Sequence, residues 1–147
     1  MYMLQAGASP AERTSLQLAS SCSGYACLTG STFTNPGWGD DAAEMEAMRV
    51  ASSKIGIATQ TQADLFSVLA AVMHMSNASF KPAVSGDDDG LDVADPLVVQ
   101  RASALMGCTD LSRLLLTRTV TIMSEPVTIQ LTADQAQAAV SAFCKAV

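Results

Sequence analysis

The residues from 59 to 75 constrain the fold most strongly, because they carry the spacing of a buried helix. Apolar side chains recur there at positions i, i+3, i+4, i+7 and i+8 of one helical face, at Leu65, Val68, Leu69, Val72 and Met73. Phe66, Ala70 and Ala71 widen that face, so we expect a helix over 60–75 that is buried on most sides. The uncharged apolar run that ends at Met75 is too short to span a bilayer.

Start and stop signals predict the other helices. Three candidate capping boxes place a hydroxyl residue three positions before Glu or Gln, at Ser9 and Glu12, at Thr59 and Gln62, and at Thr132 and Gln135. Further starts are predicted at Asp40-Asp41, Asp95-Pro96 and Thr109, and helix ends at Gly7, Gly56 and Gly107. We expect a helix end at 1–6, a short helix from 10 to 16, and helices at about 41–55, 60–75, 96–106, 110–116 and 133–147.

The periodicity changes to two between residues 118 and 131. Val120 and Ile122 alternate with polar residues before Met123-Ser124-Glu125-Pro126, and a second alternating run follows at Val127, Ile129 and Leu131. This pattern predicts a β-hairpin over about 118–131, with Pro126 at the turn or where its missing N–H has no partner. We expect loops at 19–39, held to the core by Tyr25 and Leu28, and at 81–94. The fold class is therefore mainly α, with one small β-hairpin near the C-terminal end.

Charge and cysteine usage exclude several classes of function. The net charge of −6 and the pI near 4.4 argue against a nucleic-acid partner bound through its phosphates. Cys22, Cys27, Cys108 and Cys144 form neither a CxxC pair nor a zinc-like set with His74. We expect reduced thiols in a cytosolic protein, with no metal site and no membrane partner.

Five sequence blocks, in order, resemble the myosin motor head family. Residues 63–77, ADLFSVLAAVMHMSN, resemble the family signature IFxxLAAILHLGN, and residues 40–46, DDAAEME, resemble the DDAEEFE that precedes it. Residues 2–8, YMLQAGA, resemble FYQLLAGA, and 116–119, LTRT, resemble an LTTR-type entry into a hairpin. Residues 141–145, SAFCK, resemble the DALAK motif with Cys144 in place of alanine.

The resemblance identifies residues 1–147 as part of a myosin motor domain, within the upper fifty-kilodalton subdomain between switch I and switch II. It implies a helical fragment of an actin-based, ATP-driven cytoskeletal motor. The implied partners are the actin filament and the remainder of the myosin head, in the cytoplasm and on the cytoskeleton. ATP and Mg are cofactors of the complete family head.

By resemblance, the 118–131 hairpin is the cardiomyopathy loop, which contacts actin in the family. The implied contact residues are Arg118, Thr121, Ile122, Met123, Ser124, Glu125, Pro126 and Val127. The family carries Thr, Glu, Asp or Ser sixteen residues before the DALAK block, a position that Glu125 occupies here. A fixed carboxylate there supplies the charge that phosphorylation gives other members, so we expect constitutive actin engagement; the alternative is a solvated turn glutamate.

The loop at 81–94 resembles the family's loop 4, which also lies near actin. Its acidic residues Asp87, Asp88 and Asp89 would repel the negative surface of actin, so the alternative of an exposed, solvated loop is preferred. Asp87-Asp88-Asp89-Gly90 also satisfies a bare DxxG pattern. Because no strand is expected to lead into it, we do not assign it to phosphate sensing.

The residues that bind and hydrolyse ATP in the family have no counterpart in this sequence. It contains no G-x-x-x-x-G-K-[ST] motif, no switch I NNNSSRFGK and no switch II DISGFE. We therefore expect no ATP hydrolysis, no cofactor site and no catalytic residue in this chain alone. His74 is expected to be structural, and Asn77-Ala78-Ser79 is not expected to meet a glycosyltransferase.

Two alternatives to a motor fragment stay open. One is a stand-alone, non-catalytic helical module that binds actin or another protein. The other is a product that does not fold stably. Both ends of the sequence stop within predicted helices, and the broad apolar surface of residues 65–75 requires neighbours, so we favour the fragment.

Overall fold

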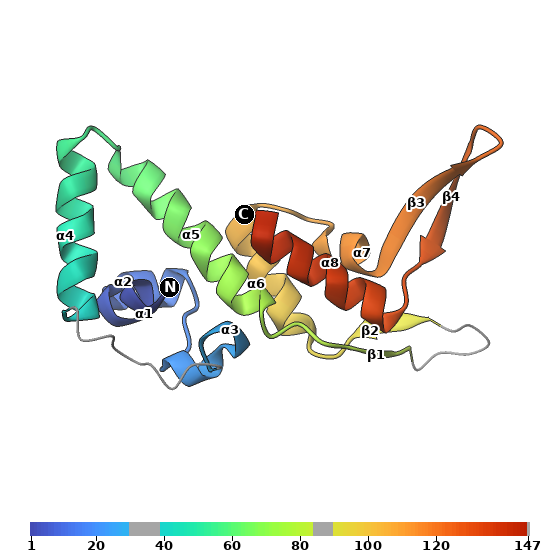
Figure 1. The fold of residues 1–147 in the computed structure, drawn as a ribbon, viewed down its shortest axis with the longest axis horizontal. Helices are drawn as coiled ribbons and strands as arrows, with labels where there is room; N and C mark the ends of the chain where they lie inside the picture. The colour runs from blue at the N-terminus through green and yellow to red at the C-terminus, as the bar shows by residue number, and fades with distance from the viewer. Residues whose placement is uncertain (30–38, 84–89, 147) are drawn as a thin grey trace. The chain divides into compact units, whose positions relative to one another are not determined.

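The computed structural model describes residues 1–29, 39–83 and 90–146 (Figure 1). The chain divides into two compact units, Met1–Met73 and His74–Val147. Unit 1 is helical, and unit 2 combines helices with two antiparallel β-hairpins. This confirms the prediction of a mainly α fold and adds a second small hairpin to the one predicted.

The described residues of unit 1 form four complete α-helices, a 3-10 turn and most of a fifth α-helix. These are α1 (Tyr2–Gly7), α2 (Pro10–Ser15), the turn Cys22–Gly24, α3 (Ala26–Thr29), α4 (Asp41–Lys54) and α5 (Thr59–Met75). The capping box at α2 is confirmed: the Glu12 amide donates to Ser9 Oγ at 3.3 Å, and the Ser9 amide donates to Glu12 Oε2 at 2.8 Å. Asp40 caps α4, because its Oδ1 accepts the Ala42 amide.

Close packing of α1 on α4 explains Gly7. A Cβ at this position would lie 2.6 Å from Met45 Cβ, and the Met45 side chain is fully buried. Gly7 is the last residue of α1, which confirms the predicted helix end, but Ala8 follows in extended conformation and Gly7 itself does not have a positive φ. Gly56 and Gly107 do have positive φ, 87° and 64°, as expected for helix ends.

In its described part, the segment expected to be a loop at 19–39 contains the 3-10 turn Cys22–Gly24 and the short helix α3. Tyr25 and Leu28 are buried, which confirms them as anchors. They are held by polar contacts: Tyr2 Oη donates to the Leu28 carbonyl at 3.0 Å, and Tyr25 Oη accepts the Ala19 amide at 2.8 Å. Residues 30–38 lie outside the described residues.

The burial of α5 is uneven along its length. Phe66 and residues 70–75 are buried, whereas Leu65 is 52% exposed, so the predicted burial holds only for the C-terminal part of the helix. Thr59 is the first residue of α5 rather than its cap. The side-chain nitrogen Nε2 of Gln62 donates to the Ile57 carbonyl and to Ser53 Oγ, and so connects α5 to the end of α4. The capping box predicted there is therefore wrong.

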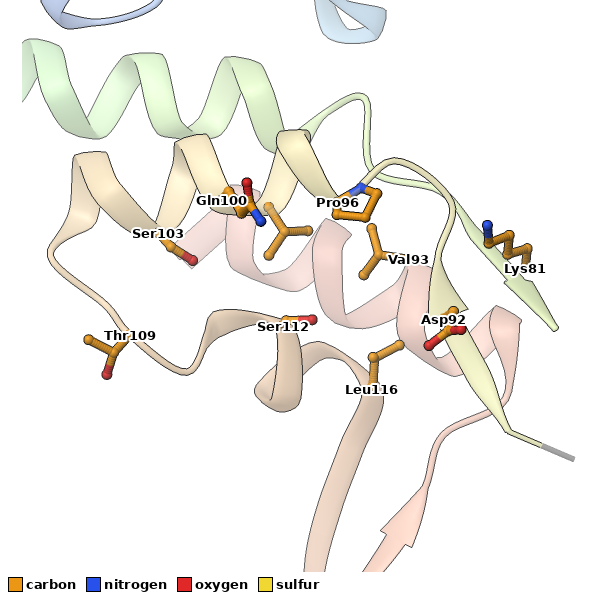
Figure 2. A pocket seen from close by; sticks show the side chains of 10 residues that line it. Lys81, Asp92, Val93, Pro96, Gln100, Ser103, Thr109, Ser112 and Leu116 are labelled. Carbon is orange, nitrogen blue, oxygen red and sulfur yellow. The ribbon is translucent and has the colours of Figure 1, made fainter. Parts of the chain in front are cut away.

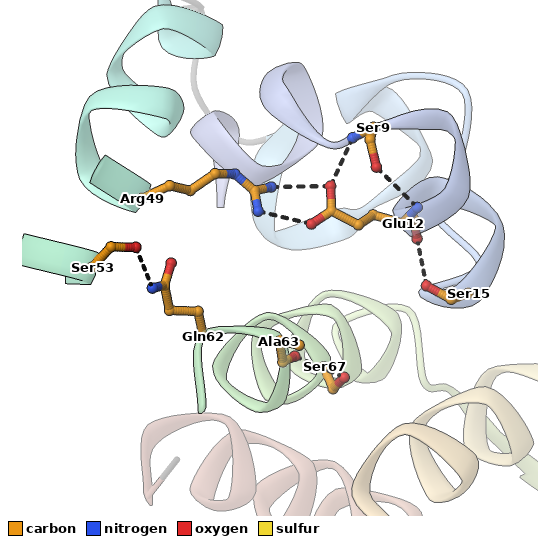
Figure 3. Close-up of polar contacts among 8 residues, drawn as sticks. All are labelled: Ser9, Glu12, Ser15, Arg49, Ser53, Gln62, Ala63 and Ser67. Atoms are coloured by element: carbon orange, nitrogen blue, oxygen red, sulfur yellow. Dashed lines mark hydrogen bonds and ion pairs between the residues drawn. The ribbon is translucent and has the colours of Figure 1, made fainter. Parts of the chain in front are cut away.

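A polar cluster joins α2, α4 and α5 within unit 1 (Figure 3). Arg49 forms a two-pronged ion pair with Glu12, with Nη1–Oε1 at 2.8 Å and Nη2–Oε2 at 3.0 Å. Its guanidinium also lies 4.8 Å from the centre of the Phe66 ring, a cation–π contact. Burial raises the pKa of Glu12, but hydrogen bonds from the Ser9 amide and from Arg49 outweigh it, so the pKa lies below its ordinary value.

Unit 2 begins in the last turn of α5 and contains α6 (Pro96–Met106), α7 (Leu111–Leu116) and α8 (Ala133–Ala146). Asp95 caps α6 by accepting the Leu97 amide at 3.0 Å. The predicted cap Thr109 is wrong, since Asp110 occupies the N-cap of α7. The capping box before α8 is confirmed by reciprocal bonds between Thr132 and Gln135.

The first hairpin of unit 2 replaces the polar loop expected at 81–94. Strands β1 (Phe80–Pro82) and β2 (Leu91–Val93) pair antiparallel, with Lys81 opposite Asp92. Leu91 and Val93 are buried, so this hairpin contributes to the core. The acidic run Asp87–Asp89 falls in 84–89, outside the described residues. His74 is buried, consistent with its predicted structural role.

Candidate interaction hairpin

The second hairpin consists of β3 (Thr117–Ile122) and β4 (Glu125–Gln130), joined by a two-residue turn (Figure 1). Met123 and Ser124 form the turn with φ of 49° and 71°. Positive φ at both central residues is the type I′ geometry, whose twist matches that of the paired strands. Neither residue is glycine or asparagine, so the turn carries a conformational cost of about 1 kcal/mol per residue.

The strand register explains why a proline is accepted at position 126 in β4. Ile122 pairs with Glu125 next to the turn, and Thr121 pairs with Pro126. In a two-residue hairpin the pair flanking the turn is hydrogen bonded, and such pairs alternate with non-hydrogen-bonded ones. Pro126 therefore falls where its missing N–H faces away from β3. This agrees with the position predicted for it.

The two faces of the hairpin differ in character. Cross-strand partners share a face, and alternate residues along a strand share it too. The register therefore places four apolar side chains and two charged ones on one face: Arg118, Val120, Ile122, Glu125, Val127 and Ile129. The opposite face carries Thr117, Thr119, Thr121, Pro126, Thr128 and Gln130. We call the first set the apolar face of the hairpin.

The apolar face is exposed, and the turn extends it. Ile122, Val127 and Ile129 are exposed large hydrophobic residues, and Ile122 is 51% exposed. Met123 at the turn is 96% exposed, the value of a side chain with almost no protein contact. Single exposed apolar residues are ordinary, but a contiguous exposed apolar patch typically marks an interaction site.

The base of the hairpin is fixed to the adjoining helices. The Leu131 amide donates to the Leu116 carbonyl at 2.8 Å, which continues the pairing beyond the strand ends. Thr117 Oγ1 donates to the Arg113 carbonyl of α7 at 2.9 Å. α7 runs directly into β3, and the capping box at Thr132 starts α8 soon after β4 ends. The hairpin is therefore anchored at the ends of both strands.

The structure divides the eight residues predicted for contact into four groups. Ile122, Glu125 and Val127 lie on the apolar face near the turn, and Met123 and Ser124 form the turn itself. Thr121 and Pro126 lie on the opposite face, and Arg118 lies near the base, opposite Ile129. Arg118 lies about 13 Å along the strand from Ile122. Because Thr121 and Pro126 lie on the opposite face, one flat contact cannot include all eight.

Two residues missing from the predicted set complete the apolar face. Val120 and Ile129 lie on it: Ile129 pairs with Arg118 near the base, and Val120 pairs with Val127 closer to the turn. The alternation of apolar residues in the sequence includes both of them, but only the pairing register shows on which face they lie. Among residues 1–29, 39–83 and 90–146, no group of His, Cys, Asp and Glu has the arrangement of a metal site.

The comparisons with known proteins place this geometry in a family. The family model of the myosin head (motor domain) matches residues 1–147. The chain belongs to the myosin head family. The β3–β4 hairpin is therefore a segment of a myosin head, and the predicted family resemblance is confirmed over the whole chain.

Individual myosins are similar to this chain over nearly its whole length. The chain is 30% identical over 148 residues to unconventional myosin heavy chain 6 of Caenorhabditis elegans, covering 99% of this chain and 7% of that protein. It is 30% identical over 147 residues to the non-muscle myosin heavy chain of Drosophila melanogaster, with the same coverage of 99% and 7%. It is 31% identical over 137 residues to unconventional myosin-Ia of Gallus gallus, covering 91% of this chain and 13% of that protein. The chain thus spans a small part of these relatives.

No helix in the described part of the chain is both long enough and apolar enough to cross a membrane.

Proposed function

We propose that this chain is a segment of an actin-based, ATP-driven motor, and that the β3–β4 hairpin is its contact with the actin filament. The exposed apolar face around Ile122 and Met123 is the observation that carries the proposal. Membership of the myosin head family supports actin as the partner and the remainder of the head as the second partner. It also supports a place for the complete protein on the cytoskeleton in the cytoplasm.

The contact is proposed to centre on the turn rather than on the whole hairpin. Met123, Ile122 and Val127 supply the apolar surface that an interface core requires. Ser124 supplies a hydroxyl at the same end, and Glu125 supplies a carboxylate. Arg118 and Thr121 are assigned to the rim, because the register places one near the base and the other on the opposite face.

Glu125 is proposed to act as a permanent charge in this contact. It is exposed, it directly follows the turn, and it forms no ion pair with any residue in the described ranges. A carboxylate at this position provides a negative charge without a kinase. Actin engagement would then not depend on phosphorylation of this hairpin.

Nucleotide chemistry is proposed to lie outside this chain. ATP hydrolysis needs backbone amides and a lysine around the phosphates, with groups that hold magnesium and the attacking water. The sequence contains no Gly-Lys pair. ATP and Mg would therefore be bound by other parts of the head, and the hairpin would act on the filament side alone.

Co-sedimentation of the complete protein with actin filaments tests the proposal. Ile122→Thr and Met123→Ala remove apolar surface without changing charge, and together they should weaken binding about tenfold or more, since central apolar contacts are worth about 1–2 kcal/mol each. Thr128→Ala, on the opposite face of β4, is the matched control and should bind as the unmodified protein does. Equal binding of all three proteins would remove the hairpin from the interface.

A further inference from the structure

A crevice in unit 2 lies between β2, α6 and α7 (Figure 2). Its volume is about 480 Å³, within the range of small-molecule sites. The lining residues are Lys81, Asp92, Val93, Pro96, Val99, Gln100, Ser103, Thr109, Ser112 and Leu116. The crevice is separate from the apolar face of the hairpin and plays no part in the function proposed above.

The lining is ordered by chemistry from one end to the other. Lys81 and Asp92 lie at the end formed by the β1–β2 hairpin (Figure 2). Val93 and Leu116 follow next along the lining (Figure 2), and Val99 is the third apolar lining residue; Val93 and Val99 are also buried in the core. Hydroxyl groups of Ser103 and Thr109 stand at the other end, where α6 gives way to α7, and Ser112 lies between them and Leu116 (Figure 2).

The polar groups of this lining are unused by the protein. In the described part of the chain, the side chains of Lys81, Asp92, Gln100, Ser103, Thr109 and Ser112 make no hydrogen bond or ion pair. Other hydroxyls of unit 2 do make such bonds, for example Thr117 to the Arg113 carbonyl and Ser141 to the Gln137 carbonyl. The crevice therefore concentrates unused donors and acceptors around these apolar side chains.

The charged end specifies the class of ligand. Lys81 and Asp92 are direct partners in the β1–β2 register, so their Cα atoms are about 5 Å apart and their side chains share a face. They offer one positive and one negative charge side by side. A lone anion or cation would meet repulsion from one of them, whereas a group with adjacent ammonium and carboxylate would be complementary to both.

We propose that this crevice binds a free α-amino acid with a long, largely apolar side chain that ends in a polar group. The ammonium group faces Asp92, and the carboxylate faces Lys81. The apolar part of the side chain lies over Val93, Val99 and Leu116, and its polar end meets the hydroxyls of Ser103, Thr109 and Ser112.

Saturation-transfer NMR on the complete protein tests this with three probes. L-Tyrosine has every group the crevice requires, tyramine lacks the carboxylate, and L-phenylalanine lacks the terminal hydroxyl. L-Tyrosine should bind with a dissociation constant in the millimolar range, and each of the other two should bind about two- to fivefold more weakly, the size of an exposed charge contact or a hydrogen bond. No transfer to L-tyrosine at millimolar concentration, or equal binding of all three, would overturn the proposal.

Two tryptophan substitutions on α7 locate the binding. Ser112→Trp places a large ring in the crevice and should abolish transfer to L-tyrosine. Leu114→Trp places the same ring on the same helix, at an exposed position outside the crevice lining, and should leave binding unchanged. If both variants bind equally, the amino acid is held elsewhere and the crevice is not its site.

Lys81→Gln provides a variant that does not depend on filling the crevice. Lys81 is exposed, so its replacement should not disturb folding. It should reduce binding of L-tyrosine about two- to fivefold, but should not weaken binding of tyramine, which has no carboxylate and is relieved of repulsion by the Lys81 ammonium. An equal reduction for both ligands, or none for L-tyrosine, would contradict the assigned orientation.

Discussion

The two hairpins of unit 2 use the same strand pairing for opposite purposes. In β1–β2, Leu91 and Val93 are buried, and the hairpin forms part of the core. In β3–β4, every residue of β4 is exposed, and apolar residues remain on the surface. Alternating apolar residues therefore do not by themselves mean a core contact. The apolar side of a hairpin is buried only where another element of the unit packs on it.

Truncation of apolar residues should separate the two hairpins most clearly. Leu91→Ala in β2 should lower the free energy of unfolding by about 2–4 kcal/mol, because it leaves a cavity in the core. Ile129→Ala in β4 should lower it by less than about 1 kcal/mol, since the side chain is already partly in water. Urea unfolding followed by circular dichroism measures both changes. Comparable losses would mean that the apolar face of the second hairpin is covered within the protein.

The charge beside the second turn should matter for binding and not for folding. Glu125→Ala should weaken co-sedimentation with actin about three- to tenfold, the effect of about 1 kcal/mol from one charge in the contact. Its unfolding midpoint should not change. Glu46→Ala, which removes an exposed carboxylate of α4, is the control and should leave actin binding unaltered. Unchanged binding for Glu125→Ala would support the alternative of a solvated turn glutamate.

The strained turn provides a test of the second hairpin alone. Replacing Met123-Ser124 by Asn-Gly supplies residues that favour positive φ at both positions, and should stabilise the hairpin by about 1 kcal/mol. Amide exchange of β3 and β4 should slow several-fold, whereas exchange in β1 and β2 should stay the same. Slowing in both hairpins would show that they unfold as one unit. The same variant removes Met123 and should therefore lose actin affinity.

The Glu12–Arg49 pair lies outside both hairpins and provides a stability test for unit 1. The folded-state pKa of Glu12 lies below its ordinary value of 4.5. Its contribution to stability is therefore complete above pH 4.5 and is lost as the pH falls through the lower folded value. Glu12→Gln should lower the free energy of unfolding by about 1 kcal/mol at pH 7. That difference should shrink on acidification, which urea titrations at pH 7 and pH 3 would detect. A difference independent of pH would show that the carboxylate charge is not what stabilises this cluster.

The sequence predicted those elements whose causes are local. Ser9 with Glu12, and Thr132 with Gln135, form capping boxes because each pair closes bonds within one turn of helix. The β3–β4 hairpin was predicted because each strand is long enough to show alternation. The β1–β2 hairpin was missed, because strands of three residues on either side of a polar segment show no period.

The remaining differences between the prediction and the structure arise from contacts between helices and strands that are far apart in the sequence. Gln62 has the spacing of a capping residue, but it is buried and bonds to Ser53 and Ile57 instead. Leu65 and Ile55 fit helical periodicity, yet both are exposed, since periodicity assigns a face without showing which turns have a neighbour. Gly7 was interpreted through backbone conformation, whereas its cause is the side chain of Met45 across the helix contact.

The position of Pro126 has a consequence for self-association. The non-hydrogen-bonded residues of β4 direct their main-chain groups outward, where a strand from another molecule could add and begin aggregation. Pro126 removes one of these donors at the exposed end of the strand, so the ladder that a second copy could form along β4 is interrupted where access is easiest. The outer edge of β3 has threonines at the equivalent positions and lacks this protection. The exposed β3–β4 hairpin is therefore protected against strand addition along the β4 edge only.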